Sequence, residues 1–301
     1  MHDQTHNALP RFCDYEGSDY RSSFWEGSGR QYEDLAERTA LRKLLPTSGE
    51  RLIDIGGGYG RLFDLYAGYR EVVLLDHATS QLQDARARLG DSGVIYVAAN
   101  LYQMPFPARA FDCAVMVRVL HHLPDVSRAF RAIHALLTCG GCFVLEYANK
   151  RHLKAVLQYL LRRGEHSPFD LEPFEFVELN YNLHPTFVED HLTAAGFQIE
   201  RQLGVSHLRV NLLKRLVPAR ILATIDGWLQ QPMAPLKCAP SMFLKSRALA
   251  DSAPQPPAQL FCCPHCQSGG LRRESDALLC SSCGRRWSTA GGIHDFRQPL
   301  S

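Results

Sequence analysis

The chain has 301 residues, of which 46% are hydrophobic and 21% charged, a globular composition that excludes collagen-like or wholly disordered structure. No apolar run approaches the ~18 residues of a transmembrane helix, and the acid-containing N-terminal stretch lacks the apolar core of a secretory signal. The formal net charge of +2 argues against strong general nucleic-acid binding. We therefore expect a cytoplasmic protein without a membrane span.

Short apolar runs alternate with segments of helical period along most of the chain. Strands are predicted at 51–55, 71–76, 94–99, 111–119, 141–148, 197–205 and 242–248. Helices are predicted near 30–45, 60–69, 79–90, 124–138, 151–163, 186–195 and 210–230, the last kinked or split at Pro218. The strands are rich in Val, Ile and Leu without clean alternation, which is typical of a parallel sheet covered by helices. The pattern predicts a doubly wound α/β domain.

A glycine-rich turn follows the first predicted strand. Asp54 precedes Gly56, Gly58 and Gly60 in the pattern D-x-G-x-G-x-G. Glycines permit positive φ and a close ligand approach, and the helix predicted to follow would add amide donors. The spacing does not fit the dinucleotide fingerprint G-x-G-x-x-G. A plain strand–turn–helix connection is the alternative interpretation.

Polar residues end the next two predicted strands. Asp76 ends the second strand, where a carboxylate suits ribose hydroxyls, although it could instead cap the following helix. Asn100 follows the third strand and offers both a donor and an acceptor to an adenine edge. Three further motifs follow in order: Met104-Pro105-Phe106, Phe111-Asp112 and Leu120-His121-His122-Leu123.

With these motifs the chain resembles the class I S-adenosylmethionine (SAM) methyltransferases, strongly over 50–150 and weakly beyond. The resemblance implies a seven-stranded sheet of order 3-2-1-4-5-7-6 whose last strand is antiparallel. It also implies SAM at the carboxyl edge, with the glycines against its aminoacyl part, Asp76 against the ribose, and Asn100 and Leu101 against adenine. Members of that family often carry Asp where Asn100 stands. The candidate SAM-binding residues are Asp54, Gly56, Gly58, Gly60, Asp76, Asn100, Leu101 and Arg118. Two interpretations of Arg118 are open: it reaches a carboxylate of SAM or of the substrate, or it pairs with a nearby acidic side chain. We favour the second.

Methyl transfer from a sulfonium needs the methyl group and the acceptor atom to be aligned. It needs a general base only where the acceptor must lose a proton. His184 is the first candidate for that base, although His184-Pro185 also suits a helix start. His121 is the second, although it could simply fix the loop that covers SAM. Glu146, at the end of the fifth strand, is the third; alternatively it caps a backbone amide or binds an arginine.

Charge is unevenly distributed. Residues 201–247 hold eight Lys/Arg and one acid (8 − 1 = +7), whereas 1–200 hold 20 basic and 26 acidic residues (20 − 26 = −6). Lys214, Arg215 and Arg220 are candidates to steer an anionic acceptor, or they coat a solvated helix face. We expect a small-molecule acceptor. The alternatives are an RNA or protein target gripped by this basic stretch, and a non-catalytic protein that binds SAM or nucleic acid. The oligomeric state is left open.

The C-terminal part carries two C-x2-C pairs separated by thirteen residues, Cys263/Cys266 and Cys280/Cys283. This spacing is typical of a structural Zn²⁺ site, and Cys262 leaves the first ligand ambiguous. The proline-rich stretch 251–259 reads as a linker between a catalytic domain at 1–250 and a zinc ribbon at 260–301. The chain continues with Gly291-Gly292-Ile293-His294-Asp295-Phe296-Arg297. With this ending the ribbon resembles the small methyltransferase-activating zinc proteins, which implies that it stabilises or completes the catalytic domain.

Overall fold

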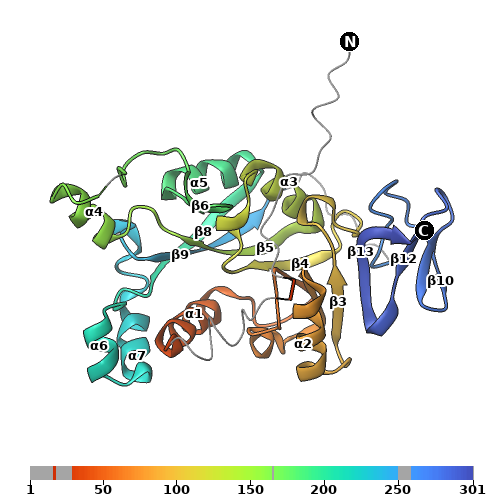
Figure 1. The fold of residues 1–301 in the computed structure, drawn as a ribbon, viewed down its shortest axis with the longest axis horizontal. Helices are drawn as coiled ribbons and strands as arrows, with labels where there is room; N and C mark the ends of the chain where they lie inside the picture. Colours follow the sequence, from red (N-terminus) through yellow and green to blue (C-terminus); the bar gives the residue numbers. More distant parts are fainter. Residues whose placement is uncertain (1–15, 18–28, 165, 250–258, 301) are drawn as a thin grey trace, which may run out of the picture.

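The computed structural model describes residues 16–17, 29–164, 166–249 and 259–300, so the predicted linker 251–259 lies outside them except for its last residue. The described chain forms one large mixed sheet of order β10-β11-β12-β13-β3-β2-β1-β4-β5-β9-β8, with helices on both faces (Figure 1). A small hairpin of β6 (Phe174–Val177) and β7 (Asn180–Asn182) stands apart from it. No helix among the described residues is long and apolar enough to cross a bilayer.

The central strands form the doubly wound α/β part that the sequence predicts. The parallel strands are β1 (Gly49–Ile55), β2 (Tyr69–Asp76), β3 (Val94–Ala98), β4 (Phe111–Met116) and β5 (Leu137–Ala148). β9 (Ser241–Ala248) runs antiparallel to both β5 and β8 (Phe197–Val205). The fourth strand is shorter than the predicted 111–119, since the backbone turns left-handed at Arg118, where φ is +62°.

Seven α-helices accompany these strands in the described chain: α1 (Gln31–Leu44), α2 (Thr79–Leu89), α3 (Val126–Leu136), α4 (Leu153–Leu160), α5 (Pro185–Ala194), α6 (Asn211–Leu216) and α7 (Ala219–Leu229). Pro218 separates α6 from α7, as predicted. The helix predicted at 60–69 is wrong, because only the 3₁₀ turn η3 (Phe63–Tyr66) forms there. Gly60 still has a φ of +72°, and the chain must enter β2 at Tyr69, which leaves room for little more than one turn.

Two hydrophobic cores lie on opposite faces of the sheet. α3 and α5 cover one face, where Phe130 and Val188 are fully buried. α1, α2 and α7 cover the other face, with Leu41 and Leu82 fully buried there (Figure 1). A fully buried side chain of this size contributes about 1.5–3 kcal/mol to stability. The two cores hold the ends of β1, β2 and β4 at fixed positions on the carboxyl edge of the sheet.

The C-terminal module continues the sheet instead of standing apart. Its strands are β10 (Leu271–Glu274), β11 (Ala277–Cys280), β12 (Arg286–Ser288) and β13 (Ile293–Leu300). β13 pairs in parallel with β3, in a register that places Ile293 opposite Tyr96 and Asp295 opposite Ala98. The sheet is therefore larger than the seven strands expected. The pairing also covers β3, which would otherwise expose unpaired backbone groups at the sheet edge.

Candidate active site

The glycine loop lies at the carboxyl end of β1, and its three alternate glycines all have positive φ. The φ values are +73° at Gly56, +50° at Gly58 and +72° at Gly60. A Cβ added to Gly56 would lie 2.2 Å from Val119 Cγ2, and one added to Gly60 would lie 2.7 Å from Leu89 Cδ1. A Cβ on Gly58 would meet nothing closer than 3.9 Å. Packing therefore requires glycine at two of these positions, while Gly58 borders open space that a ligand could approach.

Asp76 and Asn100 both bind backbone amides near this loop. Asp76 Oδ2 accepts from Gly58 N and its Oδ1 accepts from Ala78 N, each at 2.9 Å. A carboxylate has about four acceptor positions, so these two bonds do not preclude a ligand hydroxyl. Asn100 Oδ1 accepts from Tyr102 N at 2.8 Å and caps the 3₁₀ turn η4 (Leu101–Gln103), within which Leu101 is buried. The Asn100 amide nitrogen and the second lone pair of its oxygen are left for an adenine edge.

Asp54 lies beneath the glycine loop, on its buried side. Its side chain is buried, and Tyr66 Oη donates to its Oδ2 at 2.9 Å. Burial raises the pKa of Asp54 to about 7. The carboxyl carbon would lie 3.4 Å from a Cβ built on Gly57, directly under the turn. A contact between Asp54 and SAM therefore stays a prediction.

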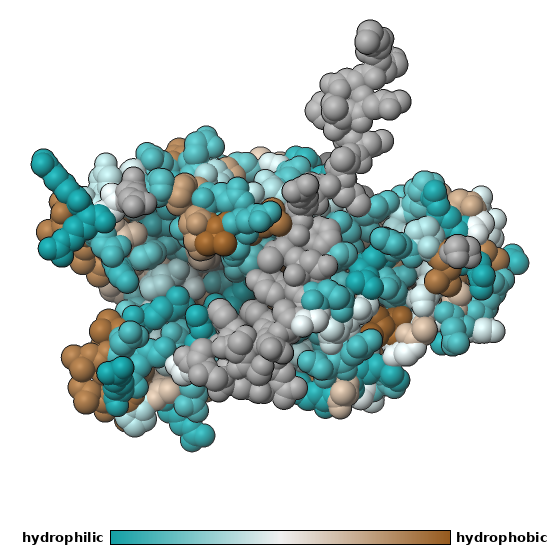
Figure 2. All heavy atoms as spheres, in the orientation of Figure 1, coloured by the Kyte–Doolittle hydropathy of each residue, from teal (hydrophilic) through white to brown (hydrophobic). Residues whose placement is uncertain are grey.

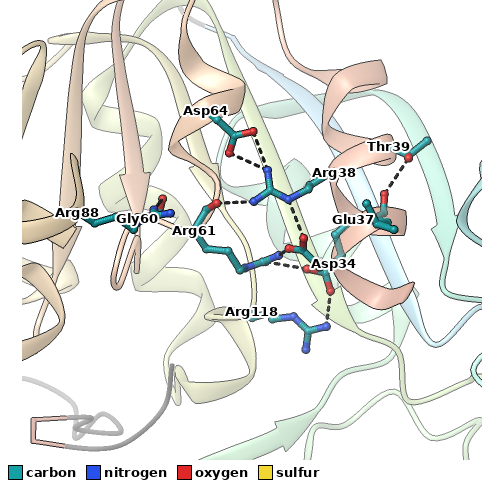
Figure 3. Close-up of polar contacts among 10 residues, drawn as sticks. Asp34, Glu37, Arg38, Thr39, Gly60, Arg61, Asp64, Arg88 and Arg118 are labelled. Carbon is teal, nitrogen blue, oxygen red and sulfur yellow. Dashed lines mark hydrogen bonds and ion pairs between the residues drawn. The ribbon is translucent and has the colours of Figure 1, made fainter. Parts of the chain in front are cut away.

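A buried ion-pair network joins α1 to the loops at the carboxyl edge (Figure 3). Glu37 of α1 is fully buried and accepts from Arg61 Nη2 at 2.8 Å and from the guanidinium of Arg118. Burial alone would raise the pKa of Glu37, yet Arg118 and Arg61 hold it below its usual value. Arg61 follows the glycine loop and Arg118 follows β4. The prediction that Arg118 pairs with a local acid is confirmed.

Sequence reasoning missed Glu37 and its bond to Arg61. The available signal was the placement of Glu33 and Glu37 on the same side of α1 as its buried Ala36 and Ala40. Acids that repeat every four residues on the buried side of a helix need cationic partners.

Glu146 and His184 hold backbone amides. Glu146 Oε2 accepts from Arg118 N at 2.8 Å, and burial raises the pKa of Glu146. His184 Nδ1 accepts from Thr186 N at 3.2 Å and caps α5, so the helix-start interpretation is confirmed. In that tautomer Nε2 carries the proton of the neutral ring. A neutral His184 can therefore donate a hydrogen bond through Nε2, while its accepting nitrogen is already used by the Thr186 amide.

His121 lies in the 3₁₀ turn η5 (Leu120–His122) just beyond β4. Its Nδ1 is buried and has no hydrogen-bond partner among the described residues. Burial, together with the charges of neighbouring His122 and Arg118, lowers the pKa of His121 well below its usual value. His121 is thus a neutral imidazole at physiological pH with an unused ring nitrogen. The lowered pKa makes this ring a weak base, which takes a proton only from a strongly acidic group. The base role of His121 stays a prediction.

The four predicted cysteines converge in the C-terminal module. All four Sγ atoms lie within 4.8 Å of one another, with Cys263 3.7 Å from Cys283 and Cys266 3.5 Å from Cys280. Four thiolates about 2.3 Å from a tetrahedral Zn²⁺ lie about 3.8 Å apart, so the spacing fits that ion. Cys262 is outside the cluster, with its Sγ 3.6 Å from Gln267 Oε1.

The turns around these cysteines have matching geometry. Gly284 and Gln267 adopt φ values of +72° and +59° just after the two pairs. Their amides donate to the carbonyls of Cys280 and Cys263 at 2.9 and 2.8 Å. The two pairs are therefore held in equivalent loops facing each other.

The module contacts the loops that carry Asp76 and Asn100. Arg297 Nη1 donates to the carbonyl of His77 at 3.1 Å, directly after Asp76. Gln103 Nε2 donates to the carbonyl of Pro264 at 2.8 Å, three residues beyond Asn100. The rings of Phe106 and Phe261 stack with centroids 5.8 Å apart. The position of both loops is therefore coupled to the module.

Much of the basic stretch 201–247 is paired locally. Lys214 Nζ lies 2.9 Å from Glu33 Oε1, and Lys237 Nζ lies 2.6 Å from Glu189 Oε2. Arg247 lies 2.7 Å from Glu200 Oε1. Lys214 is therefore engaged with α1, and of the three residues predicted to steer an acceptor only Arg215 and Arg220 are exposed.

Comparisons with known proteins agree with this geometry. A family profile described as "Methyltransferase domain" matches residues 53–145. The ubiquinone/menaquinone biosynthesis C-methyltransferase UbiE of Vibrio cholerae is 30% identical over 168 residues, which cover 50% of this chain and 65% of that protein. UbiE of Edwardsiella ictaluri is 30% identical over 168 residues, covering 50% of this chain and 67% of that protein. The chain thus spans about two thirds of the length of these relatives.

Solved structures share the fold. A structure from Listeria monocytogenes named "putative S-adenosylmethionine dependent methyltransferase" aligns with a TM-score of 0.53 and 15% identity over 73% of this chain and 99% of that one. A chain from the complex between the Haloferax volcanii Trm112 methyltransferase activator and a methyltransferase aligns with a TM-score of 0.52 and 16% identity, over 76% and 96% of the two chains. At this identity the structures support the fold alone, whereas the sequence relatives support the activity. The chain belongs to the class I SAM-dependent methyltransferases.

Proposed function

We propose that this enzyme transfers the methyl group of SAM to a small-molecule acceptor at the carboxyl edge of β1, β2 and β4. The observation that carries the proposal is the open side of Gly58 next to the Asp76 carboxylate, to which the Gly58 amide donates. A ligand can lie against the backbone there and meet a hydroxyl acceptor at the same point. The UbiE relatives are named as enzymes of ubiquinone and menaquinone biosynthesis. This name favours a small molecule over a macromolecule as the methyl acceptor.

Bound SAM supplies an electrophilic methyl group on a sulfonium. In the proposed complex Gly56, Gly58 and Gly60 lie against its aminoacyl part, Asp76 accepts from the ribose hydroxyls, and Asn100 donates to adenine. The Glu37–Arg61–Arg118 network holds the loops on either side of this site in place. Much of the rate enhancement of such a displacement can come from alignment of donor and acceptor.

We assign His121 as the general base for a substrate that loses a proton when it receives the methyl group. The relatives are named C-methyltransferases, and a carbon nucleophile of an aromatic ring releases a proton when it is methylated. His121 has an unused ring nitrogen at the carboxyl edge, whereas His184 already uses its acceptor nitrogen as a helix cap. The lowered pKa makes His121 a weak base, which is sufficient here because the cationic ring formed by methylation is a much stronger acid than an imidazolium. Glu146 is engaged with the Arg118 amide, which makes it a positioning residue.

We infer that Cys263, Cys266, Cys280 and Cys283 bind one structural Zn²⁺. The module at 260–301 is too small for a core of its own, so metal binding would stabilise its fold. Its contacts to His77 and Gln103 support a role in holding the loops of Asp76 and Asn100. The Haloferax complex contains an activator and a methyltransferase, and here we propose that catalytic domain and supporting module share one chain.

The test is a transfer assay with methyl-labelled SAM and a cell extract as the source of acceptors. We expect label in the solvent-extractable small-molecule fraction and little in protein or RNA. His121→Asn should lower the transferred label at least about tenfold with unchanged SAM affinity, within the usual range for general bases. His184→Asn, which keeps a capping oxygen, is the matched control and should retain activity. Label confined to RNA or protein would overturn the small-molecule proposal.

A further inference from the structure

α4 presents an unpartnered row of leucines. Leu153, Leu157 and Leu160 recur at i, i+4 and i+7 and are 56%, 50% and 65% exposed. No residue of α4 is buried, so the helix lies on the surface with its apolar side toward solvent. Isolated exposed leucines are ordinary, but a row at helical spacing marks an interaction surface.

α7 presents a second row with the same spacing. Ile221, Ile225 and Trp228 are exposed, Trp228 by 74%. The opposite side of α7 is buried against α1 through Leu222 and Ala223, so packing already holds this helix in place. Leu212 and Leu216 of α6 add two more exposed leucines nearby.

The two rows lie at the same end of the molecule. α4 and α6–α7 form the two tips at the left of Figure 1, and both tips carry hydrophobic side chains in Figure 2. The tips therefore form one discontinuous apolar surface, which we call the two-tip surface (exposed apolar residues of 153–161 and 212–228).

Positive charge lies beside both apolar rows, and the segment after α4 carries the exposed acids Asp170, Glu172, Glu175 and Glu178. Residues 150–163 contain five Lys/Arg and no acid, and residues 207–225 contain four Lys/Arg and no acid. Lys150 is turned to the carbonyl oxygens of Asp170 and Glu172, and Arg209 and Lys214 pair with Glu33. The remaining cations have no acid within ion-pair distance among the described residues; those exposed on the tips are Lys154, Arg162, Arg163, Arg215 and Arg220.

We propose that the two-tip surface docks on an anionic lipid bilayer. Apolar rows flanked by Lys and Arg are the pattern of helices that lie in a membrane interface, with the apolar side in the acyl boundary and the cations at the headgroups. A second copy of the chain fits this surface poorly, because docking like on like would bring the cations of both tips together. The tips anchor the protein on the bilayer without crossing it.

In this docked orientation the carboxyl edge of the sheet, where the proposed active site lies, faces the lipid. β5 and β8 lead toward α4 and α6, and they end at Ala148 and Val205, both opposite Ser241 of β9. That end is also the carboxyl edge of β1, where the glycine loop lies. An acceptor dissolved in the bilayer could therefore reach the site without crossing bulk water. The docking itself does not depend on the identity of that acceptor.

The experiment is flotation of the full-length protein with vesicles, followed by quantification of the bound fraction. We expect binding to phosphatidylcholine vesicles containing phosphatidylglycerol, and at least about tenfold weaker binding to phosphatidylcholine alone or at high salt. R162E/R163E/R215E/R220E and L157S/L160S/I221S/W228S should each lower the partition coefficient at least about tenfold. All the changed side chains are exposed, so folding should be retained, as circular dichroism can check.

Matched controls use exposed residues of the C-terminal module. R272E/R273E and L300S should leave vesicle binding within about twofold, because these side chains lie away from the tips. Absence of wild-type binding to anionic vesicles, or equal losses in the control variants, would overturn the proposal. A dimer in sedimentation analysis that the apolar variant dissociates, without vesicle binding, would overturn it in favour of self-association.

Discussion

The backbone amide of Gly58 donates a 2.9 Å hydrogen bond to Asp76 Oδ2, and this contact joins the glycine loop to the end of β2. The loop contributes open backbone and the strand contributes charge, and the proposed SAM site needs both. Asp76 thus holds the loop in the fold, and in the proposed complex it also accepts from the ribose.

Asp76→Ala should weaken SAM binding by about 1.5–3 kcal/mol, the range for lost hydrogen bonds to a charged group. Calorimetry would show this as a rise in Kd of roughly tenfold or more. Asp91→Ala is the control, because Asp91 is exposed and pairs only with Arg86 among the described residues. Unchanged affinity in Asp76→Ala would show that the ribose assignment is wrong.

The variants Gly56→Ala and Gly90→Ala distinguish the cost of backbone strain from the cost of a steric clash between the new Cβ and its neighbours. Both glycines have a φ of +73°, and Gly90, with a ψ of −161°, lies in a region that only glycine readily adopts, so its substitution costs about 1–3 kcal/mol in backbone energy. Only the Gly56 Cβ would overlap Val119, while nothing lies within 4 Å of a Cβ at Gly90. We expect Gly56→Ala to be the less stable variant by about 1–3 kcal/mol in denaturant unfolding. SAM affinity should fall in Gly56→Ala alone; equal behaviour of the two variants would contradict the packing argument.

Glu37→Gln should destabilise the fold by about 3 kcal/mol, because it leaves Arg61 and Arg118 without their buried counter-charge. Glu50→Gln is the comparison, since Glu50 pairs with Arg70 on the surface, where such pairs contribute less than about 1 kcal/mol. Denaturant unfolding of both variants measures the difference. Similar small losses in both would mean that the Glu37 network contributes little.

The central part of the fold and the glycine loop could be predicted because their signals are local. Apolar runs mark the parallel strands, and the glycines and Asp76 stand within a short stretch of sequence. The Glu37 network could not be predicted in the same way, because it joins α1 to two loops that only the folded sheet brings together. The pairing of β13 with β3 is likewise a contact between distant segments, and the residues involved carry no pattern that names their partner.

The pH dependence of stability should reveal the buried Asp54. Its pKa in the folded protein is raised to about 7 from 3.8, so the folded state holds the proton more tightly than the unfolded state. This stabilisation is fully present below pH 4 and is lost as the pH rises through 7, by at most about 4 kcal/mol. Asp54→Asn keeps the side chain neutral at every pH, so its stability relative to wild type should rise between pH 5 and pH 8.

Thermal unfolding of wild type and Asp54→Asn across this range measures the effect. The same substitution at the exposed Asp190 is the control. A difference between wild type and Asp54→Asn that does not change between pH 5 and pH 8 would contradict the raised pKa.

Metal analysis tests the cysteine cluster. The protein purified without added metal should contain about one equivalent of zinc, and Cys280→Ser should lose it. Cys262→Ser should keep the zinc, because that sulfur faces Gln267 outside the cluster. Chelation of the wild-type zinc should also weaken SAM binding, since the module holds the loops of Asp76 and Asn100. Retained zinc in Cys280→Ser would show that the ligand set is wrong.

Hydrogen–deuterium exchange with and without S-adenosylhomocysteine tests the site assignment most directly. We expect the ligand to slow exchange in peptides that cover the glycine loop at 54–60, the end of β2 at 76–78 and the turn at 99–103. Peptides from β10 and β11, on the far side of the C-terminal module, should be unaffected. Protection of all three segments would support a SAM site at the carboxyl edge of the sheet. Binding without protection of the glycine loop would contradict it.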